Sequence, residues 1–465
     1  MRVRIFGQYL HVSVIALAAF EAVLLYLVLF GATFVRFHYN FAAAEHSHGP
    51  VWPRALLFSA ATIASLLAFG LYSARQRARS VGLVVRIVAA VSAGVGISAV
   101  VIYLVPYLDV GRGVLAGAAI GAVAVAFVVR LGFDRLLDDV AFKRRVLVYG
   151  TGKNATALAR LRRRSDQRGF TLVGFVQPEG EGAEIPSDRI LSSGRDIMPL
   201  CAAHQVDEVV VAMDDRRQSF PIRELLECRL AGVSVTELLT FLERETGRVR
   251  IDLLNPSWLI FGEGFRRGNI RLFTSRALDL LASLTLLIVG SPLMLVVALT
   301  VKLEEGWRAP VLYHQERVGL GGKTFQLLKF RSMRPDAENG QAVWAQRNDP
   351  RVTRVGAIIR KLRIDEMPQL VNVLRGEMSF VGPRPERPQF VEELAEKIPY
   401  YIERHCVKPG ITGWAQLCYP YGATEKDALE KLQYDLYYIK NNSFLFDLAI
   451  LIQTIEVVFM GKGAR

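Results

Sequence analysis

The chain has 465 residues, of which 57 are Lys or Arg and 44 are Asp or Glu, so its formal net charge is +13. At about 100 to 200 residues per domain, this length predicts two to four folding units. Hydrophobic residues make up 51% of the chain and charged residues 22%, which excludes a disordered chain and disfavours a simple soluble globule. The four cysteines lie far apart without a CxxC pair, so they indicate neither a zinc site nor a disulfide framework: Cys201, Cys228, Cys406 and Cys418.

The apolar residues are concentrated in four runs at the start of the chain, at about residues 10–35, 52–72, 83–107 and 113–130. Each run is close to the ~20 residues that cross the hydrocarbon core of a bilayer. They predict a four-helix transmembrane bundle over residues 1–135. Glu21 is the exception in helices that otherwise carry almost no charge, so we interpret the bundle as an anchor rather than a transport pathway.

The orientation of this bundle follows from its basic residues. The loop after the second run carries Arg75, Arg77 and Arg79, and the exit from the fourth run begins with Arg130 and Arg135. Because cytoplasmic loops are enriched in Lys and Arg, both ends of the bundle are expected in the cytoplasm.

Residues 143–262 alternate between short strands and helices, which is typical of a Rossmann-like α/β domain. Strands are predicted at Val146–Tyr149, Leu172–Val176 and Glu208–Ala212. Helices are predicted near residues 195–204 and 220–231.

A glycine turn follows the first of these strands. Gly150, Gly152 and Ala155 match the turn that lets a dinucleotide pyrophosphate approach a helix N-terminus. A NAD site requires an acidic residue at the end of the second strand, but Gln177 and Pro178 stand there. Whether this domain binds a nucleotide is therefore left open by the sequence, and a regulatory or dimer-forming role is expected rather than redox chemistry.

The next apolar stretch, residues 278–303, is interrupted by Ser291 and Pro292. Proline removes a backbone hydrogen bond, and the serine hydroxyl can satisfy a carbonyl that the break sets free. Basic residues flank both ends, so a crossing helix would place one cluster on the outer side, against the positive-inside tendency. We expect a re-entrant helical hairpin over residues 276–303 that turns at Ser291 and Pro292. A fifth, kinked transmembrane helix is the alternative.

Two strands are predicted beyond this stretch, at Val311–Gln315 and Phe325–Phe330. The turn between them ends in Gly-Lys-Thr like a Walker A loop, but Arg317 stands where the first glycine is required and no helix follows. The turn is therefore interpreted as a hairpin. Lys329 and Arg331 lie two residues apart, on one strand face, and are suited to holding anionic oxygens.

The adjacent carboxylates Asp365 and Glu366 follow a run of cations. Neighbouring carboxylates on a helix diverge, so they take two separate roles, and at least one should stay ionised as a nucleophile or metal ligand. A solvated helix start is the alternative. Arg384 lies between two prolines, which fix its backbone and aim its guanidinium. A rigid cation near an acidic pair suggests phosphate chemistry.

From about Arg276 to its end, the sequence resembles the bacterial sugar transferases that act on polyprenyl phosphate, the monotopic phosphoglycosyl transferases. The resemblance rests on Ser291-Pro292, Gln315-Glu316-Arg317-Val318-Gly319, Lys329-Phe330-Arg331-Ser332-Met333, Asp365-Glu366-Met367-Pro368-Gln369-Leu370, Ser379-Phe380-Val381-Gly382-Pro383-Arg384-Pro385 and Lys408-Pro409-Gly410-Ile411-Thr412-Gly413-Trp414-Ala415-Gln416. With the preceding bundle and Rossmann-like domain, the whole chain resembles the long members of that family, which implies an α+β catalytic domain over residues 272–465.

This resemblance implies transfer of a hexose 1-phosphate from a UDP-sugar to undecaprenyl phosphate, with release of UMP, at the cytoplasmic side of the bacterial inner membrane. It implies that Asp365 attacks the β-phosphorus, that Glu366 assists as a base or metal partner, and that Mg²⁺ or Mn²⁺ binds at Asp365. The phosphate oxygens would be held by four cations: Lys329, Arg331, Arg384 and Arg317. Membrane lipid and a second copy of the chain are further expected partners, and nucleic acid is not.

Two other functions would leave different marks in the sequence. A membrane-anchored nucleotide sugar dehydratase would need a Tyr-x-x-x-Lys pair, but Tyr434, Tyr437 and Tyr438 have no lysine four residues later. A non-enzymatic regulator of polysaccharide assembly would have no reason to keep the acidic pair beside Arg384. The apolar C-terminal segment, Phe444–Met460, is interrupted by polar residues and is expected to lie at the membrane surface.

Overall fold

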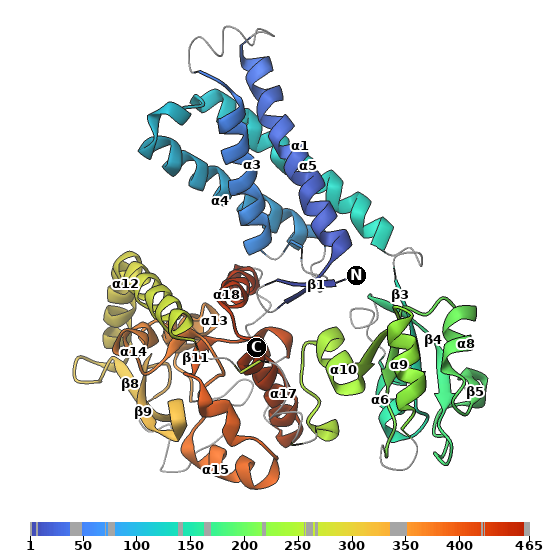
Figure 1. Cartoon of the computed structure of the whole chain (residues 1–465). Helices are drawn as coiled ribbons and strands as arrows, with labels where there is room; N and C mark the ends of the chain where they lie inside the picture. Colours follow the sequence, from blue (N-terminus) through green and yellow to red (C-terminus); the bar gives the residue numbers. More distant parts are fainter. Residues whose placement is uncertain are drawn as a thin grey trace. The chain divides into compact units, whose positions relative to one another are not determined.

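The structure is a computed structural model of the whole chain (Figure 1). It describes residues 2–5, 8–37, 49–69, 71–72, 80–137, 143–161, 169–215, 220–254, 256, 264–265, 268–334, 351–419, 422 and 424–459. The basic loop with Arg75, Arg77 and Arg79 lies outside these residues. The chain divides into two compact units, Met1–Leu254 and Asn255–Arg465.

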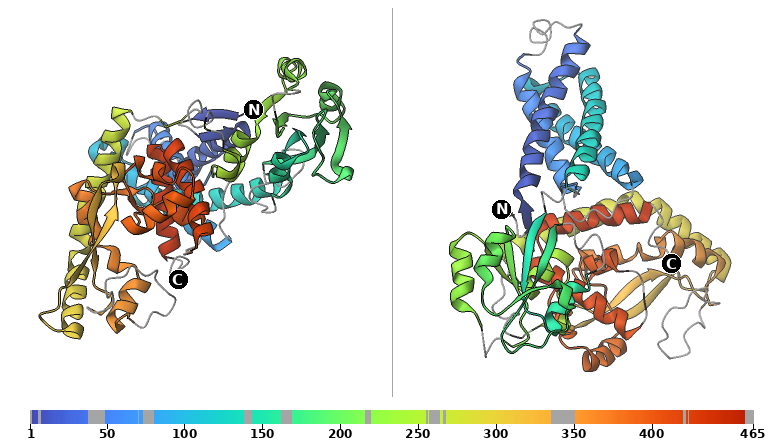
Figure 2. Two further views of the ribbon diagram at one scale, coloured as in Figure 1. Left: turned by 90° about the horizontal axis from the view of Figure 1, so that it is seen from below. Right: turned by 90° about the vertical axis from the view of Figure 1, so that its right-hand side faces the viewer.

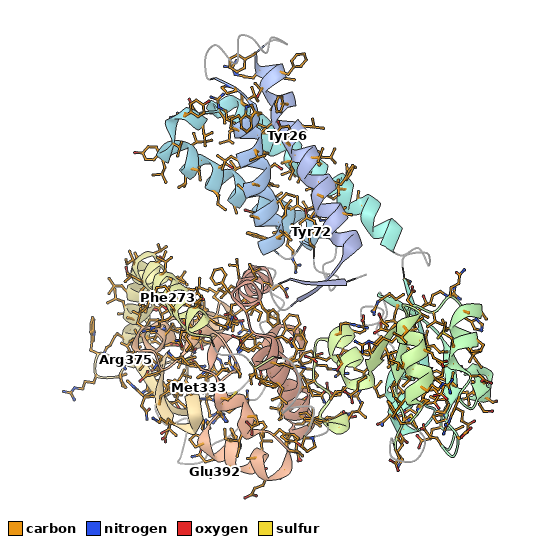
Figure 3. The ribbon with its side chains drawn as sticks, in the orientation of Figure 1. Tyr26, Tyr72, Phe273, Met333, Arg375 and Glu392 are labelled. Carbon is orange, nitrogen blue, oxygen red and sulfur yellow. The ribbon has the colours of Figure 1, made fainter. Side chains whose placement is uncertain are left out.

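The first part of the N-terminal unit is a bundle of long helices. Two short antiparallel strands, β1 (Arg2–Ile5) and β2 (Gln8–His11), precede it. Its helices are α1 (Val12–Arg36), α3 (Trp52–Ala68), α4 (Ser80–Leu104) and α5 (Arg112–Leu137). Figure 3 shows the side chains that fill the bundle, where Tyr26 packs against a buried apolar core that includes Leu25 and Leu29.

Among the described residues, four helices are long and apolar enough to cross a membrane, namely α1, α4, α5 and α12 (Asn269–Glu305). The second predicted span, α3, is shorter than expected, because it ends at Ala68 rather than near residue 72. The four predicted helices of the bundle are all present.

The bundle buries more charge than the sequence indicated. Arg130, counted above among the cytoplasmic exit residues, is buried, and its Nη1 atom lies 2.7 Å from Oε2 of Glu21. The guanidinium of Arg130 stacks 4.6 Å from the ring centroid of Tyr72, whose hydroxyl donates to Glu21. Because an unpaired charge in an apolar interior is costly, Glu21 is tolerated there through this pairing.

The second part of the N-terminal unit is a five-stranded parallel sheet with helices on both faces. Its elements are β3 (Arg144–Tyr149), α6 (Lys153–Ala159), β4 (Phe170–Gln177), β5 (Ile190–Ser193), α8 (Ile197–Ala203), β6 (Glu208–Val211), α9 (Ile222–Leu230), β7 (Ser234–Glu237) and α10 (Leu238–Thr246). The strand order is β5-β4-β3-β6-β7, which is the order of a Rossmann fold. The predicted alternation of strands and helices is confirmed as a parallel sheet with helices.

Strand alternation builds two cores around this sheet. Val146 and Val148 of β3 face α6 and α10, whereas Leu147 and Tyr149 face α8 and α9. Because successive strand side chains point to opposite faces, a run of buried apolar residues such as β3 supplies both cores at once.

The C-terminal unit mixes helices with short strand pairs. Its elements are α12, β8 (Leu312–Val318), β9 (Thr324–Phe330), α13 (Arg354–Lys361), α14 (Gln369–Arg375), β10 (Ser379–Val381), α15 (Pro388–Lys397), β11 (Gly410–Thr412), α16 (Trp414–Cys418), α17 (Glu425–Asn441) and α18 (Phe444–Phe459). Strands β8 and β9 are antiparallel, and β10 and β11 are parallel. The turn over residues 319–323 joins the antiparallel strands β8 and β9, so the predicted β-hairpin is confirmed.

The helix α12 runs through Pro292 and bends along its course (Figures 1 and 2). The hydroxyl of Ser291 donates to the carbonyl of Ile288 at 2.8 Å. Ile288 is four residues before Pro292, so this is the carbonyl that the proline cannot serve, as the sequence predicted. Gly290, two residues before Pro292, lies against the side chain of Met367, which follows the acidic pair.

Candidate functional site

The turn that carries Asp365 and Glu366 is built by the end of α13. Glu304 of α12 accepts the backbone N–H groups of Arg354 and Val355 at 2.8 and 3.1 Å, and so caps the start of α13 with a negative charge. The helix ends at Lys361, and Arg363 turns the chain with a left-handed φ of 56°. A short 3₁₀ turn over Ile364–Glu366 then presents both carboxylates.

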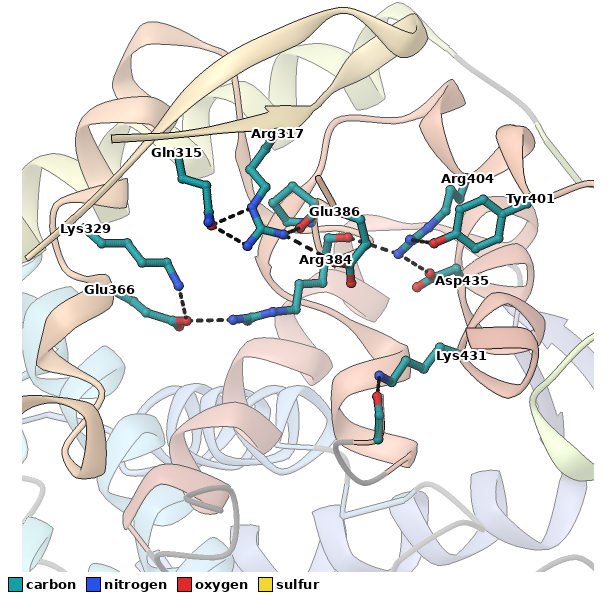
Figure 4. Close-up of polar contacts among 12 residues, drawn as sticks. Gln315, Arg317, Lys329, Glu366, Arg384, Glu386, Tyr401, Arg404, Lys431 and Asp435 are labelled. Carbon is teal, nitrogen blue, oxygen red and sulfur yellow. Dashed lines mark hydrogen bonds and ion pairs between the residues drawn. The ribbon is translucent and has the colours of Figure 1, made fainter. Parts of the chain in front are cut away.

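Two cations from distant parts of the unit meet on Glu366 (Figure 4). Lys329 Nζ of β9 lies 3.2 Å from Oε1 of Glu366, and Arg384 Nη2 lies 2.8 Å from the same oxygen. The side chain of Glu366 is only 13% exposed, so these contacts are protected from solvent screening. Four of the predicted site residues are therefore brought together: Asp365, Glu366, Lys329 and Arg384.

The surroundings of the two carboxylates shift their pKa values in opposite directions. Burial alone would raise the pKa of Glu366, but the adjacent Arg384 and Lys329 outweigh it and hold that pKa well below its usual range. Burial and the neighbouring Glu366 raise the pKa of Asp365, and burial lowers the pKa of Lys329. Two carboxylates with diverging pKa values are suited to different roles, as the sequence analysis expected.

A buried asparagine, which no sequence motif indicates, fixes β9 to α14. Asn372 is fully buried, and its Oδ1 accepts the backbone N–H of Leu328 at 3.0 Å. Its Nδ2 donates to the carbonyl of Gln326 and to Glu377, both at 2.7 Å. Because Leu328 directly precedes Lys329, these bonds hold the strand that carries Lys329.

A buried aspartate and a buried tyrosine, whose roles no sequence motif indicates, hold β10, the strand that leads to Arg384. Asp279 of α12 accepts the hydroxyl of Ser379 and the backbone N–H of Phe380, both at 2.9 Å. The hydroxyl of Tyr438 in α17 lies 3.1 Å from the carbonyl of Val381 and 2.9 Å from Asp447 of α18. Only the fold identifies these contacts with β10, because Asp279 and Tyr438 are about 100 and 57 residues from the strand residues that they bind.

The other two predicted phosphate-binding cations have different surroundings. Arg331 comes one residue after the end of β9, and its Nε donates to the carbonyl of Pro310 at 3.0 Å. Arg317 donates to Gln315 at 2.5 and 3.0 Å and to the carbonyl of Pro385 at 2.9 Å. The structure thus does not place Arg331 beside Lys329 on Glu366, and a phosphate-binding role for either arginine stays a prediction.

The residues around Asp365 are compatible with Mg²⁺, which was expected there. No group of three His, Cys, Asp or Glu side chains gathers in the part of the chain that the structure describes. Mg²⁺ often binds through one or two carboxylates and completes its shell with water and substrate phosphates. Glu366 Oε1 is engaged by two cations, so Asp365 is the carboxylate better suited to hold such an ion.

The glycine turn of the Rossmann-like domain is engaged by carboxylates of the same chain. Oε1 of Glu181 accepts the backbone N–H groups of Thr151 and Gly152 at 2.8 and 2.6 Å. Asp214 accepts those of Lys153 and Asn154, both at 2.8 Å. A nucleotide phosphate at this turn would have to displace both carboxylates, and nucleotide binding at Gly150, Gly152 and Ala155 stays a prediction.

Residues 270–461 match the family described as Bacterial sugar transferase. The chain is 43% identical over 268 residues to the UDP-N-acetylgalactosamine-undecaprenyl-phosphate N-acetylgalactosaminephosphotransferase of Aeromonas hydrophila, covering 57% of this chain and 62% of the relative. It is 34% identical over 354 residues to the undecaprenyl-phosphate glucose phosphotransferase of Komagataeibacter xylinus, covering 74% and 65%. It is 31% identical over 353 residues to the UDP-glucose:undecaprenyl-phosphate glucose-1-phosphate transferase of Escherichia coli (strain K12), covering 74% of each. The chain thus spans a little under two thirds of the first two relatives and about three quarters of the third.

Proposed function

The chain belongs to the bacterial sugar transferase family, and from this premise we propose that it transfers a hexose 1-phosphate from a UDP-sugar to undecaprenyl phosphate and releases UMP. The activities by which the three relatives are named support the acceptor and the reaction class. The observation that carries the proposal is the acidic pair, with Glu366 held between Lys329 and Arg384 and Asp365 beside it.

The proposed reaction has two displacements at one phosphorus atom. An oxygen of Asp365 attacks the β-phosphorus of the UDP-sugar, the bond from that phosphorus to the bridging oxygen breaks, and UMP leaves. An oxygen of undecaprenyl phosphate then attacks the same phosphorus and breaks its bond to Asp365, giving the sugar-diphospho-lipid. One phosphoanhydride is broken and one is formed, so the overall transfer needs no ATP.

The side chains around Asp365 support its role as the nucleophile and the role of Lys329 and Arg384 as phosphate-stabilising cations. Arg384 and Lys329 keep the carboxylate of Glu366 ionised. The same ion pairs hold both cations in place before a diphosphate binds. Asp365 has no comparable ion pair among the contacts of the described residues, so its oxygens are available for attack. Lys329 and Arg384 would stabilise the phosphate oxygens as charge shifts to UMP. Asp365 would hold Mg²⁺, which when bound would supply positive charge to neutralise the phosphates.

The membrane placement of α12 belongs to the same proposal, in which α12 enters and leaves the cytoplasmic leaflet. Before Pro292, Arg276 donates to two carbonyls at the end of α14, and Asp279 binds β10. After Pro292, Val301 packs with Phe330 in a buried cluster. Residues 276 and 301 would be about 37 Å apart on a straight helix, yet both are packed within one unit. This supports a bend that returns to the same side.

The proposal also covers the cellular location, the placement of α18 and the role of the Rossmann-like domain. The protein would lie in the bacterial inner membrane, with the Rossmann-like domain and the catalytic domain in the cytoplasm. Helix α18 would lie along the membrane surface. The Rossmann-like domain would regulate the enzyme or form a homodimer, because the catalytic motifs all follow residue 276.

The function is tested by incubating membranes that contain the protein with undecaprenyl phosphate and radiolabelled UDP-glucose, UDP-galactose or UDP-N-acetylgalactosamine. The wild-type chain is expected to release UMP and label the lipid with one donor. Asp365→Asn should abolish both, while Asp188→Asn, the same change at an exposed aspartate, should not. Chelation of divalent ions should also stop UMP release. UMP release by Asp365→Asn at the wild-type rate would refute the covalent mechanism, and no release with any donor would favour a dehydratase or a regulator.

The placement of α12 is tested by cysteine labelling in intact cells. Leu272 and Leu303 are exposed and lie on either side of Pro292, so they are suitable positions for introduced cysteines. Cysteines at both should react only after the cytoplasmic side is opened to a membrane-impermeant reagent. Labelling of either one from outside would indicate a crossing helix.

A further inference from the structure

The loop that carries Arg384 has each of four successive carbonyls bound by another part of the unit. Pro383 O accepts the N–H of Gly410 at 2.9 Å, and Glu386 O accepts the N–H of Val318 at 2.9 Å. The two carbonyls between them, of Arg384 and Pro385, accept from arginine side chains. Prolines at 383 and 385 already restrict this backbone, so the two arginines complete its fixation.

Arg317 of β8 forms one side of this arrangement (Figure 4). Its Nη1 donates to Pro385 O at 2.9 Å and lies 3.3 Å from Oε2 of Glu386. Gln315, two residues earlier on β8, accepts from Nε and Nη2 of Arg317 and fixes the plane of the guanidinium. Several donors of the guanidinium fork are therefore committed to the loop and its support.

Arg404 forms the other side and is buried. Its Nη2 donates to Arg384 O at 3.0 Å and to Oδ2 of Asp435 at 2.9 Å. Its Nη1 donates to the hydroxyl of Tyr401 at 2.8 Å. A buried arginine that pairs with Asp435 and also serves a loop carbonyl is held in one geometry from three directions.

We propose that Arg317 and Arg404 are positioning residues that fix the backbone of residues 383–386, so that the guanidinium of Arg384 stays aimed at Glu366 and at the diphosphate of the donor. This inference rests on the proposed function and deepens it. It gives Arg317 a different role from direct phosphate binding. The energetic reason is that a positioned guanidinium stabilises developing phosphate charge without reorganising first.

A double-mutant cycle with Arg384 separates positioning from direct binding. Arg317→Gln and Arg404→Lys are each expected to lower kcat/KM for the UDP-sugar by about tenfold in the wild-type background, because each weakens charge-assisted hydrogen bonds to the loop. In an Arg384→Ala background the same changes should lower kcat/KM by less than about twofold, since there is no longer a guanidinium to aim. A tenfold loss in both backgrounds would overturn the proposal, because it would mean that Arg317 or Arg404 acts independently of Arg384.

A second measurement does not depend on activity. Amide hydrogen exchange of the full-length protein in nanodiscs reports the order of the loop through the N–H of Gly410, which binds Pro383 O. Arg317→Gln should speed exchange there by about tenfold, whereas Leu394→Ala, a destabilising change at a buried residue of α15, should not. Unchanged exchange in Arg317→Gln would overturn the proposal. If the wild-type chain transferred no sugar, the proposed function would fail, and the exchange measurement would still decide whether the arginines fix the loop.

Discussion

Replacing Asn372 by leucine tests how the unit holds Lys329 against the acidic pair. The substitution keeps a similar volume but removes the bonds to the N–H of Leu328 and the carbonyl of Gln326. A buried backbone group left without a partner costs about 1 to 3 kcal/mol, so two of them cost about 2 to 6 kcal/mol. The extra apolar contact of leucine offsets about 1 kcal/mol of this. We therefore expect a net loss of about 3 kcal/mol in the free energy of unfolding.

The assay is thermal unfolding of the purified protein in nanodiscs, followed by the rate of UMP release per folded molecule. For a unit of this size, about 3 kcal/mol corresponds to an unfolding temperature lower by about 6 to 12 °C. Activity per folded molecule should also fall, because β9 carries Lys329, whose Nζ must stay 3.2 Å from Glu366. Asn269→Leu, at an exposed position, serves as the control. An Asn372→Leu variant within about 1 °C of wild type, with unchanged activity, would refute the reasoning.

Three other predictions concern a buried histidine, the bundle and the division of the chain. Burial and the neighbouring arginine lower the pKa of His405 to about 4, below its ordinary 6.5, so the unfolded chain takes up the proton first as pH falls. The contribution of His405 to the free energy of unfolding should be complete above about pH 6.5 and should fall by up to about 3 kcal/mol towards pH 4. In unfolding measured as a function of pH, His405→Gln should show a smaller decrease. In the bundle, Glu21→Leu should cost about 3 to 5 kcal/mol, because it leaves Arg130 buried and unpaired. Adding Arg130→Leu should recover most of the loss in detergent unfolding, and an equally unstable double variant would contradict this. Finally, a chain beginning at Asn255 should still release UMP in nanodiscs, and inactivity equal to its Asp365→Asn counterpart would mean that the N-terminal unit contributes to the site.

The helices and strands could be predicted because their signals are local. The continuous apolar run Val146–Tyr149 predicted β3, and the proline within a longer apolar run predicted the break at which the Ser291 hydroxyl serves a freed carbonyl. The parallel sheet of the Rossmann-like domain agrees with the repeated strand-helix pattern, because parallel strands need a crossover connection between them. The end of α3 was misplaced, because residues 69–72 remain apolar although the helix has stopped.

The candidate site could be predicted only where its residues occur in sequence motifs. Asp365, Glu366 and Arg384 have such motifs, but Asn372 and Asp279 bind strands about 44 and 100 residues away in sequence, a pairing that only the fold creates. Arg331 was expected on the face of Lys329 from strand alternation. Strand β9 ends at Phe330, so the alternation does not govern the residue that follows.

The carboxylates at the glycine turn of the Rossmann-like domain have a thermodynamic consequence. A domain whose turn is completed by a dissociable ligand gains stability by mass action, and its unfolding temperature rises with the concentration of that ligand. Glu181 and Asp214 belong to the same polypeptide as the turn. Their effective concentration at the turn is therefore set by the chain and not by the surrounding solution. In this structure, the amides of Gly152 and Asn154 are therefore satisfied without any dissolved ligand.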